Sequence, residues 1–359
     1  MLITLAAMAV ASLALQSQTD TTFAVPAGAS LSVNNFGGAI IVRGWNQNRI
    51  RVQAEHGRRG RVEVSLVGST VTVKSGSRQG PPTVTDMEIT VPQATPLRLS
   101  GTYAEITVEG VTGPISAETV DGEVNVRGGK GNITLRSIQG PVTLADASGR
   151  IEVNSVNEDV SVSNTSGELR VETNNGEVTL LGIQSSSVEA ATINGDVTYD
   201  GTIADGGSYS FSSHNGDITM TIPERANVTI TTATANGEID ASFSLPVTST
   251  PGKRRWTFKL GTGSARLEAE SFQGDIRLRR PGEVQRDRGR DSKNHDSNND
   301  FDFNFDFDVK VNETVDSAAS YAARYASEYA PRYAREYAPI YARMYARTYS
   351  RVFSRQSSQ

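Results

Sequence analysis

The chain has 359 residues, of which 37% are hydrophobic and only 7% aromatic, with 33 Gly and no Cys. The lack of Cys excludes a disulfide framework, a thiolate zinc site and a cysteine nucleophile, and the three His are widely scattered in the sequence. The net charge of -5 combines a basic segment of +5 (residues 317–359) with a remainder of -10. Because an acidic body repels phosphate, we expect no specific nucleic acid partner, and we expect no cofactor or metal.

The first segment, residues 1–17, is expected to be a signal peptide. The run Leu2–Leu15 is apolar but too short to cross a bilayer as a helix. Ser12 and Ala14 form a small-x-small pair that a signal peptidase could cleave after. No later run is apolar enough to span a membrane, so we expect no transmembrane span. The protein should therefore be exported, to the periplasm, the outer surface or the medium.

Residues 18–100 alternate between apolar and polar positions, with Gly or Pro between short runs such as Val71–Val73 and Met87–Val91. This alternation is typical of strands that bury one face. We expect these strands to form an N-terminal cap and the first coils of a longer array, because the open edge of an array has to be protected.

A nine-residue repeat organises residues 101–280. Each unit is a turn, usually with Gly, followed by an apolar-polar-apolar triplet, as in Gly122–Val126 and Gly131–Leu135. Asn-Gly pairs at Asn175 and Asn194 lie nineteen residues apart, so two units form one coil of about 18 to 21 residues. A single unit buries too little apolar surface to offset its conformational entropy, and the coils must stack.

The predicted fold class is therefore all-β, a single-chain β-solenoid that resembles a parallel β-helix. Its interior should be filled with aliphatic side chains rather than form a lumen. Connections between parallel strands favour a right-handed path, which we expect here.

Several segments between residues 20 and 280 resemble the bacterial putative-adhesin family. They are Phe23-x-Val25, Gly38-x-Ile40-x-Val42, the Gly44–Val52 stretch, the Ile-Thr-Val91-Pro92 step and the Ser213–Pro223 segment. The resemblance implies a β-solenoid domain of the cell envelope with no assigned function. It carries no catalytic motif and does not explain the residues after 280.

Residues 281–300 are rich in charged and polar side chains and poor in apolar ones, so we expect a disordered charged linker. In residues 301–311, Phe alternates with Asp or Asn, and four Phe and two Val would share one face of a strand. We expect this amphipathic strand to add to a sheet of the solenoid or of another chain.

Residues 317–355 form a Tyr-, Ala- and Arg-rich tail in which Tyr recurs every four residues. A four-residue step turns a helix by about 400°, so the ring stripe would wind around it. Pro331 and Pro339 would kink or divide such a helix. Either the tail is a partly helical, solvated segment without a ligand, or it binds a partner or a second copy of the protein. The candidate contact residues are Tyr321, Tyr325, Tyr329, Tyr333, Tyr337, Tyr341, Tyr345, Tyr349, Arg343, Arg347 and Arg351.

Aligning the units two per coil places seven carboxylates at the first outward position of one face. They are Glu105, Glu123, Asp159, Glu177, Asp196, Asp217 and Glu238. Two interpretations stay open. The carboxylates cap free backbone N–H groups at the turns, or they form an acidic strip that binds divalent cations or the basic tail.

These features predict a non-enzymatic, exported envelope protein, an adhesin-like scaffold that binds an envelope polymer or a protein partner and that can self-associate. No acid, base and nucleophile stand apart from the periodic polar residues, so no catalytic residue is assigned. Two alternatives remain. One is a filament-forming assembly protein like the bactofilins, and the other is a periplasmic sensor or regulatory domain of a membrane stress system.

Overall fold

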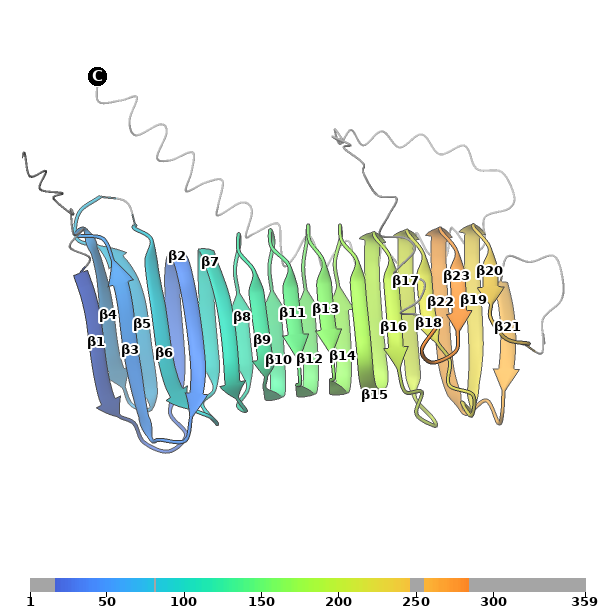
Figure 1. The fold of residues 1–359 in the computed structure, drawn as a ribbon, viewed down its shortest axis with the longest axis horizontal. Coiled ribbons are helices and arrows are strands. Elements are labelled where there is room, and N and C mark those ends of the chain that lie inside the picture. Colours follow the sequence, from blue (N-terminus) through green and yellow to red (C-terminus); the bar gives the residue numbers. More distant parts are fainter. Residues whose placement is uncertain (1–16, 81, 246–254, 284–359) are drawn as a thin grey trace, which may run out of the picture. The chain divides into compact units, whose positions relative to one another are not determined.

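A computed structural model describes residues 17–80, 82–245 and 255–283 of the chain. All regular elements in these residues are strands, β1 to β23 (Figure 1). The predicted all-β solenoid is confirmed. The expectations for the signal peptide, the amphipathic strand 301–311, the tail 317–355 and all but the first three residues of the linker 281–300 lie outside the described residues.

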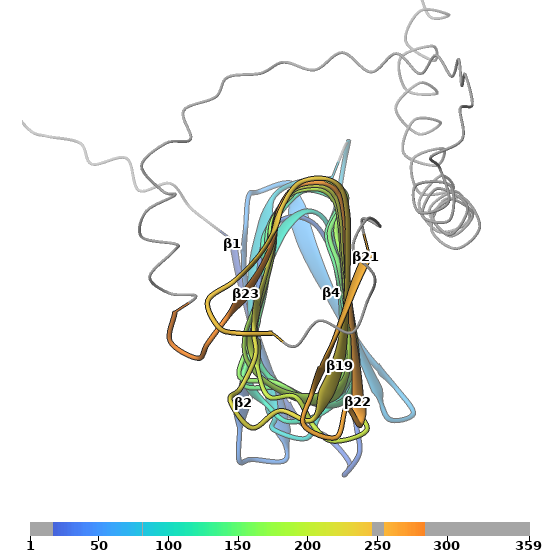
Figure 2. The ribbon, with the colours of Figure 1, turned by 90° about the vertical axis from the view of Figure 1, so that its right-hand side faces the viewer.

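The strands form two faces that enclose a narrow, flattened core when the stack is viewed from its end (Figure 2). The first face, here called face A, contains in spatial order β1 (Ser17–Ala24), β3 (Arg49–His56), β6 (Thr85–Pro92), β2 (Ser30–Trp45), β7 (Leu97–Val111), β9 (Val124–Gly128), β11 (Val142–Ala145), β13 (Val160–Ser163), β15 (Val178–Asn194), β16 (Val197–Gly201), β18 (Ile218–Thr221), β23 (Ile276–Arg279) and β20 (Ile239–Ala241).

The opposite face, face B, contains in the same direction β4 (Gly60–Val67), β5 (Thr70–Ser77), β2, β7, β8 (Ile115–Glu118), β10 (Lys130–Arg136), β12 (Ser148–Asn154), β14 (Ser166–Glu172), β15, β17 (Ser208–Asn215), β22 (Ala265–Gln273), β19 (Val228–Asn236) and β21 (Arg255–Leu260). The long strands β2, β7 and β15 bend at a corner, and each contributes to both faces.

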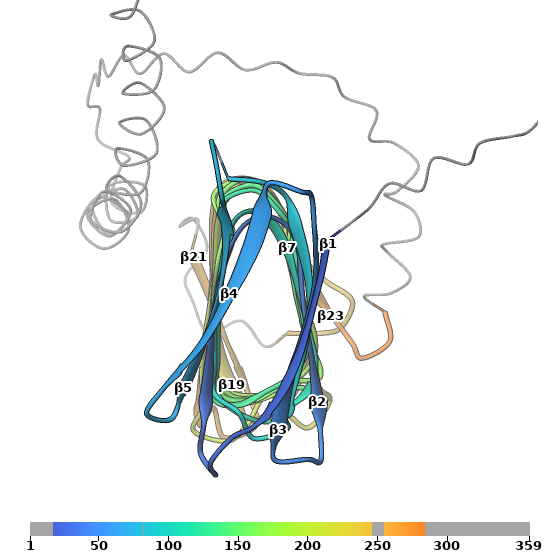
Figure 3. The ribbon, with the colours of Figure 1, turned by 90° about the vertical axis from the view of Figure 1, so that its left-hand side faces the viewer.

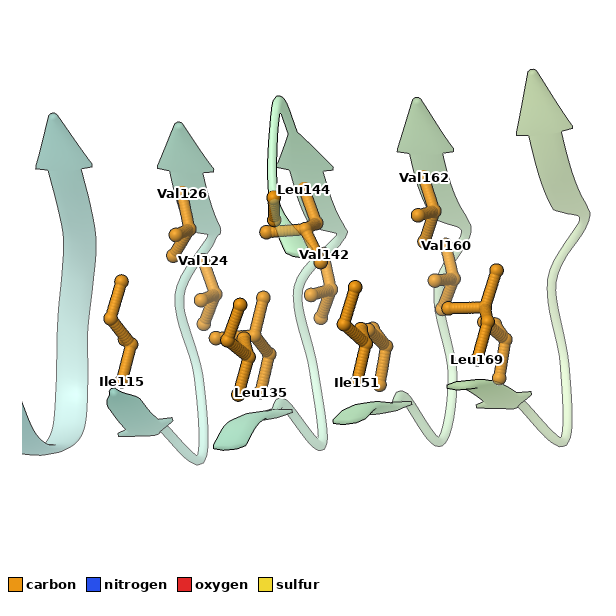
Figure 4. Close-up of a cluster of buried hydrophobic side chains, with 14 of the residues drawn as sticks. Ile115, Val124, Val126, Leu135, Val142, Leu144, Ile151, Val160, Val162 and Leu169 are labelled. Carbon is orange, nitrogen blue, oxygen red and sulfur yellow. The ribbon is translucent and has the colours of Figure 1, made fainter. Parts of the chain in front are cut away.

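Successive coils pair in parallel with aliphatic side chains in register. On face B, Ile115, Ile133 and Ile151 are aligned at eighteen-residue steps. The inward side chains of both faces meet in one continuous core (Figure 4). From β15 onward the step widens, to nineteen residues between Val178 and Val197 and to twenty-one between Val197 and the next coil. The predicted coil length of 18 to 21 residues is therefore confirmed.

In the wider coils, tyrosine hydroxyls form hydrogen bonds with backbone groups. The fully buried Tyr199 donates a hydrogen bond to the Thr202 carbonyl at 2.7 Å. The hydroxyl of Tyr209 donates to the Ser185 carbonyl and accepts the N–H of Ala204, both at 2.8 Å. The extra residues after β16 thus depart from the regular coil, and these backbone groups still have hydrogen-bond partners.

Coil order departs from chain order at both ends of the stack. The last strands, β22 and β23, lie between the coil of β17 and β18 and the coil of β19 and β20. At the other end, β2 lies between β7 and the later strands β5 and β6. Antiparallel pairing occurs at both ends: β3 is antiparallel to β6 and to β1, and β4 to β5, at one end, and β21 is antiparallel to β19 at the other. The nine-residue pattern alone did not predict this exchange of neighbours.

The corner that carries the Asn-Gly pairs is tightly packed. Gly195 has φ of +152°, and a Cβ at this position would lie 2.0 Å from the carbonyl oxygen of Gly176. Only glycine fits, because the backbones of neighbouring coils approach too closely for a side chain. A buried hydroxyl satisfies the same carbonyl, since Thr192 Oγ1 donates to Gly176 O at 3.0 Å.

Asparagine side chains form a ladder along this corner. Asn175 Nδ2 donates to Asn157 Oδ1 at 3.1 Å, Asn194 to Asn175 at 2.8 Å, and Asn215 to Asn194 at 2.7 Å. The sequence pattern of repeated Asn-Gly is thus explained by bonds between coils as well as by turn conformation.

Candidate functional site

The predicted acidic strip lies on face A, next to the Asn-Gly corner. The strand register places its members in one row and adds one further residue, Asp275, to that row. Because β23 lies between β18 and β20, Asp275 stands between Asp217 and Glu238 in the row. The sequence alignment missed Asp275, although its Gly274-Asp275-Ile276 motif matches the other units. The order is Glu105, Glu123, Pro141, Asp159, Glu177, Asp196, Asp217, Asp275 and Glu238.

The aspartates of the strip cap backbone amides of the next coil. Asp159 Oδ1 accepts the N–H of Glu177 at 2.7 Å, and Asp196 Oδ1 accepts that of Asp217 at 2.8 Å. The same bond joins Asp217 to Asp275 at 2.7 Å, Asp275 to Glu238 at 2.9 Å, and Asp86 to Ala39 at 2.9 Å. Capping therefore accounts for the aspartates, through the following coil rather than through their own turn.

The glutamates of the strip are arranged differently, because their side chain is one methylene longer. Glu177 accepts a hydrogen bond from Thr179 at 2.7 Å. Glu105 and Glu123 are exposed, and neither forms an ion pair within the described part of the chain. Arg277 pairs with Asp217 at 2.7 Å and with Asp275 at 3.2 Å, so the strip is compensated at its C-terminal end. Within the described residues, its carboxylates without an ion pair therefore include Glu105 and Glu123 in the first coils.

A row of hydroxyl and amide side chains runs beside the strip on face A. It occupies the polar position between the two inward aliphatics of each unit. Its members are Thr107, Asn125, Thr143, Ser161, Thr179, Thr198 and Thr219. Carboxylates and hydroxyls thus recur together at about 4.8 Å, the spacing of neighbouring strands.

The pKa of Asp196 reflects the electrostatic environment of the strip. Loss of hydration between neighbouring coils raises the pKa of this aspartate, and the charges of Asp217 and Glu177 raise it further. The hydrogen bond from the Asp217 amide opposes the shift. The carboxylates are close enough to repel one another, so a cation placed along the row would relieve unfavourable charge.

Two histidines lie within the strands. His56 lies in β3, with its Nδ1 3.1 Å from the Gly57 carbonyl oxygen and its Nε2 3.5 Å from Thr19 Oγ1. His214 lies in β17 and stacks on Phe272, with ring centroids 4.7 Å apart. No group of three or more His, Asp or Glu within the described ranges could hold a metal ion. The described part of the chain also contains no helix that is long and apolar enough to cross a membrane.

We expect Asp159→Ala to destabilise the fold by about 1 kcal/mol, because the Glu177 amide loses the acceptor that caps it. Asp159→Asn keeps an acceptor oxygen and should cost about 0.5 kcal/mol or less. Glu123→Ala, in the same row but without a capping bond, is the matched control and should change stability by less than about 0.5 kcal/mol. Urea unfolding measures all three. Equal effects for Asp159→Ala and Glu123→Ala would contradict the capping role.

Several solved structures resemble the chain, among them the following three. A putative cell adhesion protein from Clostridium sporogenes is 11% identical, with 74% of this chain and 99% of that one covered and a TM-score of 0.19. A putative lipid binding protein from Parabacteroides distasonis is 10% identical, over 73% and 96%, with a TM-score of 0.38. A putative adhesin from Parabacteroides distasonis is 7% identical, over 74% and 98%, with a TM-score of 0.24.

No curated protein sequence matches the chain. One family model, described as Toastrack DUF4097, matches residues 29–313, a range that includes strands β2 to β23. The family resemblance expected from the sequence is confirmed. The chain belongs to the Toastrack DUF4097 family.

Proposed function

We propose that the protein is an exported, non-enzymatic scaffold of the cell envelope and that face A binds a linear partner. The observation that carries this proposal is the register of two polar rows, the acidic strip and the hydroxyl row, over successive coils. A contact made at one coil can be repeated at the next, which suits a polymer or an extended protein segment. Catalysis instead requires one distinct constellation of groups.

The charge of the strip favours a basic partner. The Tyr- and Arg-rich segment of a second copy is one such partner, because it carries +5 against -10 for the rest of the chain. A helix rises about 6 Å per four residues, against about 4.8 Å per coil. Long Arg side chains can bridge this difference, so Arg343, Arg347 and Arg351 are proposed to contact successive carboxylates, with the tyrosines packing between them.

The strand directions at the ends of the stack bear on the filament-forming alternative but not on the sensor or regulatory alternative. Filament growth through the ends would require the parallel ladder to continue from one molecule to the next on both faces, but the outermost strands of face B, β4 and β21, run antiparallel to it. Such growth is therefore disfavoured. A sensor or regulatory domain would use the same polar face toward a membrane partner and differs from the scaffold only in what the bound partner then does.

The export half of the proposal is tested by mass spectrometry of the mature N-terminus after cell fractionation. We expect cleavage near residue 17 and recovery of the protein outside the cytoplasm. An intact Met1 on protein that remains in the cytoplasm would contradict export and would favour an intracellular assembly role.

The binding half is tested with a synthetic peptide of residues 317–355 and the full-length protein. We expect Glu105→Gln with Glu123→Gln to weaken binding roughly five- to tenfold at low salt, and the difference to shrink at high salt. Glu118→Gln with Glu224→Gln removes the same charge from exposed sites outside the strip and is the matched control. Fluorescence anisotropy reports affinity, and circular dichroism checks the fold. Equal losses for both pairs would contradict a specific role of face A.

A further inference from the structure

We propose that one corner at the N-terminal end of the stack docks on an anionic lipid surface. This N-terminal corner consists of Arg58, Arg59, Arg78, Val84 and Tyr103. It is distinct from the acidic strip and goes beyond the function proposed for face A. The five residues come from three separate segments, the β3–β4 connection, the β5–β6 connection and β7.

The structure brings these segments into contact. The connections β3–β4 and β5–β6 meet where the N–H of Arg78 donates to the Arg59 carbonyl at 2.8 Å. Gly60, at the start of β4, adjoins Thr83, the residue before Val84: a Cβ added to Gly60 would lie 2.8 Å from Thr83 Oγ1. Gly37, in the bend of β2, adjoins both Val84 and Tyr103. A Cβ added to Gly37 would lie 3.8 Å from Val84 Cγ2 and 3.6 Å from Tyr103 Cβ. In Figure 3 the β5–β6 connection rises above the other corners of the stack.

The corner carries positive charge without compensation. Arg58, Arg59 and Arg78 are exposed, and within the described residues none of them forms an ion pair. Their neighbours Arg51 and Arg61, in contrast, pair with Asp20 and Glu63.

Two carboxylates adjoin the corner on face A. Glu55 and Asp86 are paired in the β3–β6 ladder, and Asp86 accepts the Ala39 amide. The arginines therefore remain available to phosphate groups, which they bind with bidentate hydrogen bonds.

Apolar side chains are exposed beside the arginines. Val84 is 64% exposed and Tyr103 is 53% exposed, and Tyr103 packs edge-on against Phe36 with ring centroids 5.5 Å apart. The other large hydrophobic side chains exposed in the described residues are Leu66 and Val67, on the outermost strand of the same end. Tyrosine and aliphatic side chains next to basic ones are the combination that favours the interface of an anionic bilayer.

The shape of the corner also favours a membrane over another partner. A protruding tip with apolar and basic side chains suits a flat lipid surface better than an extended peptide, which needs a groove.

The test uses a fluorescent label at Val84. Because the chain has no Cys, Val84→Cys in the full chain as isolated from cells can carry one environment-sensitive fluorophore. We expect a blue shift with vesicles of phosphatidylglycerol and phosphatidylcholine, and none with phosphatidylcholine alone. Asn125→Cys, exposed on face A, is the matched label control and should not shift. Vesicle co-sedimentation with an unchanged label at residue 84 would overturn the proposal and assign binding to another basic segment.

Charge variants test whether the three arginines direct the docking. Arg58→Glu, Arg59→Glu and Arg78→Glu together should weaken vesicle binding reported at residue 84 at least about tenfold, since each basic side chain near the surface contributes about 1 kcal/mol. Arg98→Glu, Lys130→Glu and Arg225→Glu reverse the same charge at other exposed sites and should leave the blue shift. Equal losses in both triple variants, or a blue shift that requires no anionic lipid, would contradict docking through this corner.

Discussion

Backbone hydrogen bonding between successive coils is the interaction on which the rest of the structure depends. It holds neighbouring strands at about 4.8 Å, and this spacing leaves no room for a Cβ where Gly195 meets Gly176. The same spacing lets Asn194 bond to Asn175 and lets Asp196 cap the Asp217 amide. Glycine, asparagine and aspartate therefore recur because each coil must satisfy the backbone of the next.

The stack also determines where binding surfaces can form. Rows of equal side chains arise wherever coils repeat, which gives face A its strip and its hydroxyl row. The N-terminal end lacks the repeat, and there chain segments that are distant in sequence converge, as Arg59 and Arg78 do. One molecule thus presents an acidic, repetitive face and a compact, basic corner. A scaffold with one surface for a linear partner and another for a lipid layer would hold that partner beside a membrane.

The sequence predicted the coil length, the inward aliphatics and the strip, because each of these depends on residues nine or eighteen positions apart. It did not predict that β22 and β23 pair with β17 and β18. The units at Gly237 and Gly274 are nearly interchangeable, and local pattern does not identify which of them follows Gly216. The N-terminal corner was missed for a related reason, since no periodic signal links Arg58, Val84 and Tyr103.

Paired cysteines most directly test the exchange of coil order, which distinguishes this architecture from a simple solenoid. In the described stack Ser208 is aligned with Arg266, and Arg266 with Thr229. A disulfide requires Cα atoms closer than about 7 Å. We expect Ser208→Cys with Arg266→Cys to oxidise readily, and Ser208→Cys with Thr229→Cys to stay reduced, as read by peptide mapping without reductant. Bridging of the second pair but not the first would show that the coils stack in chain order.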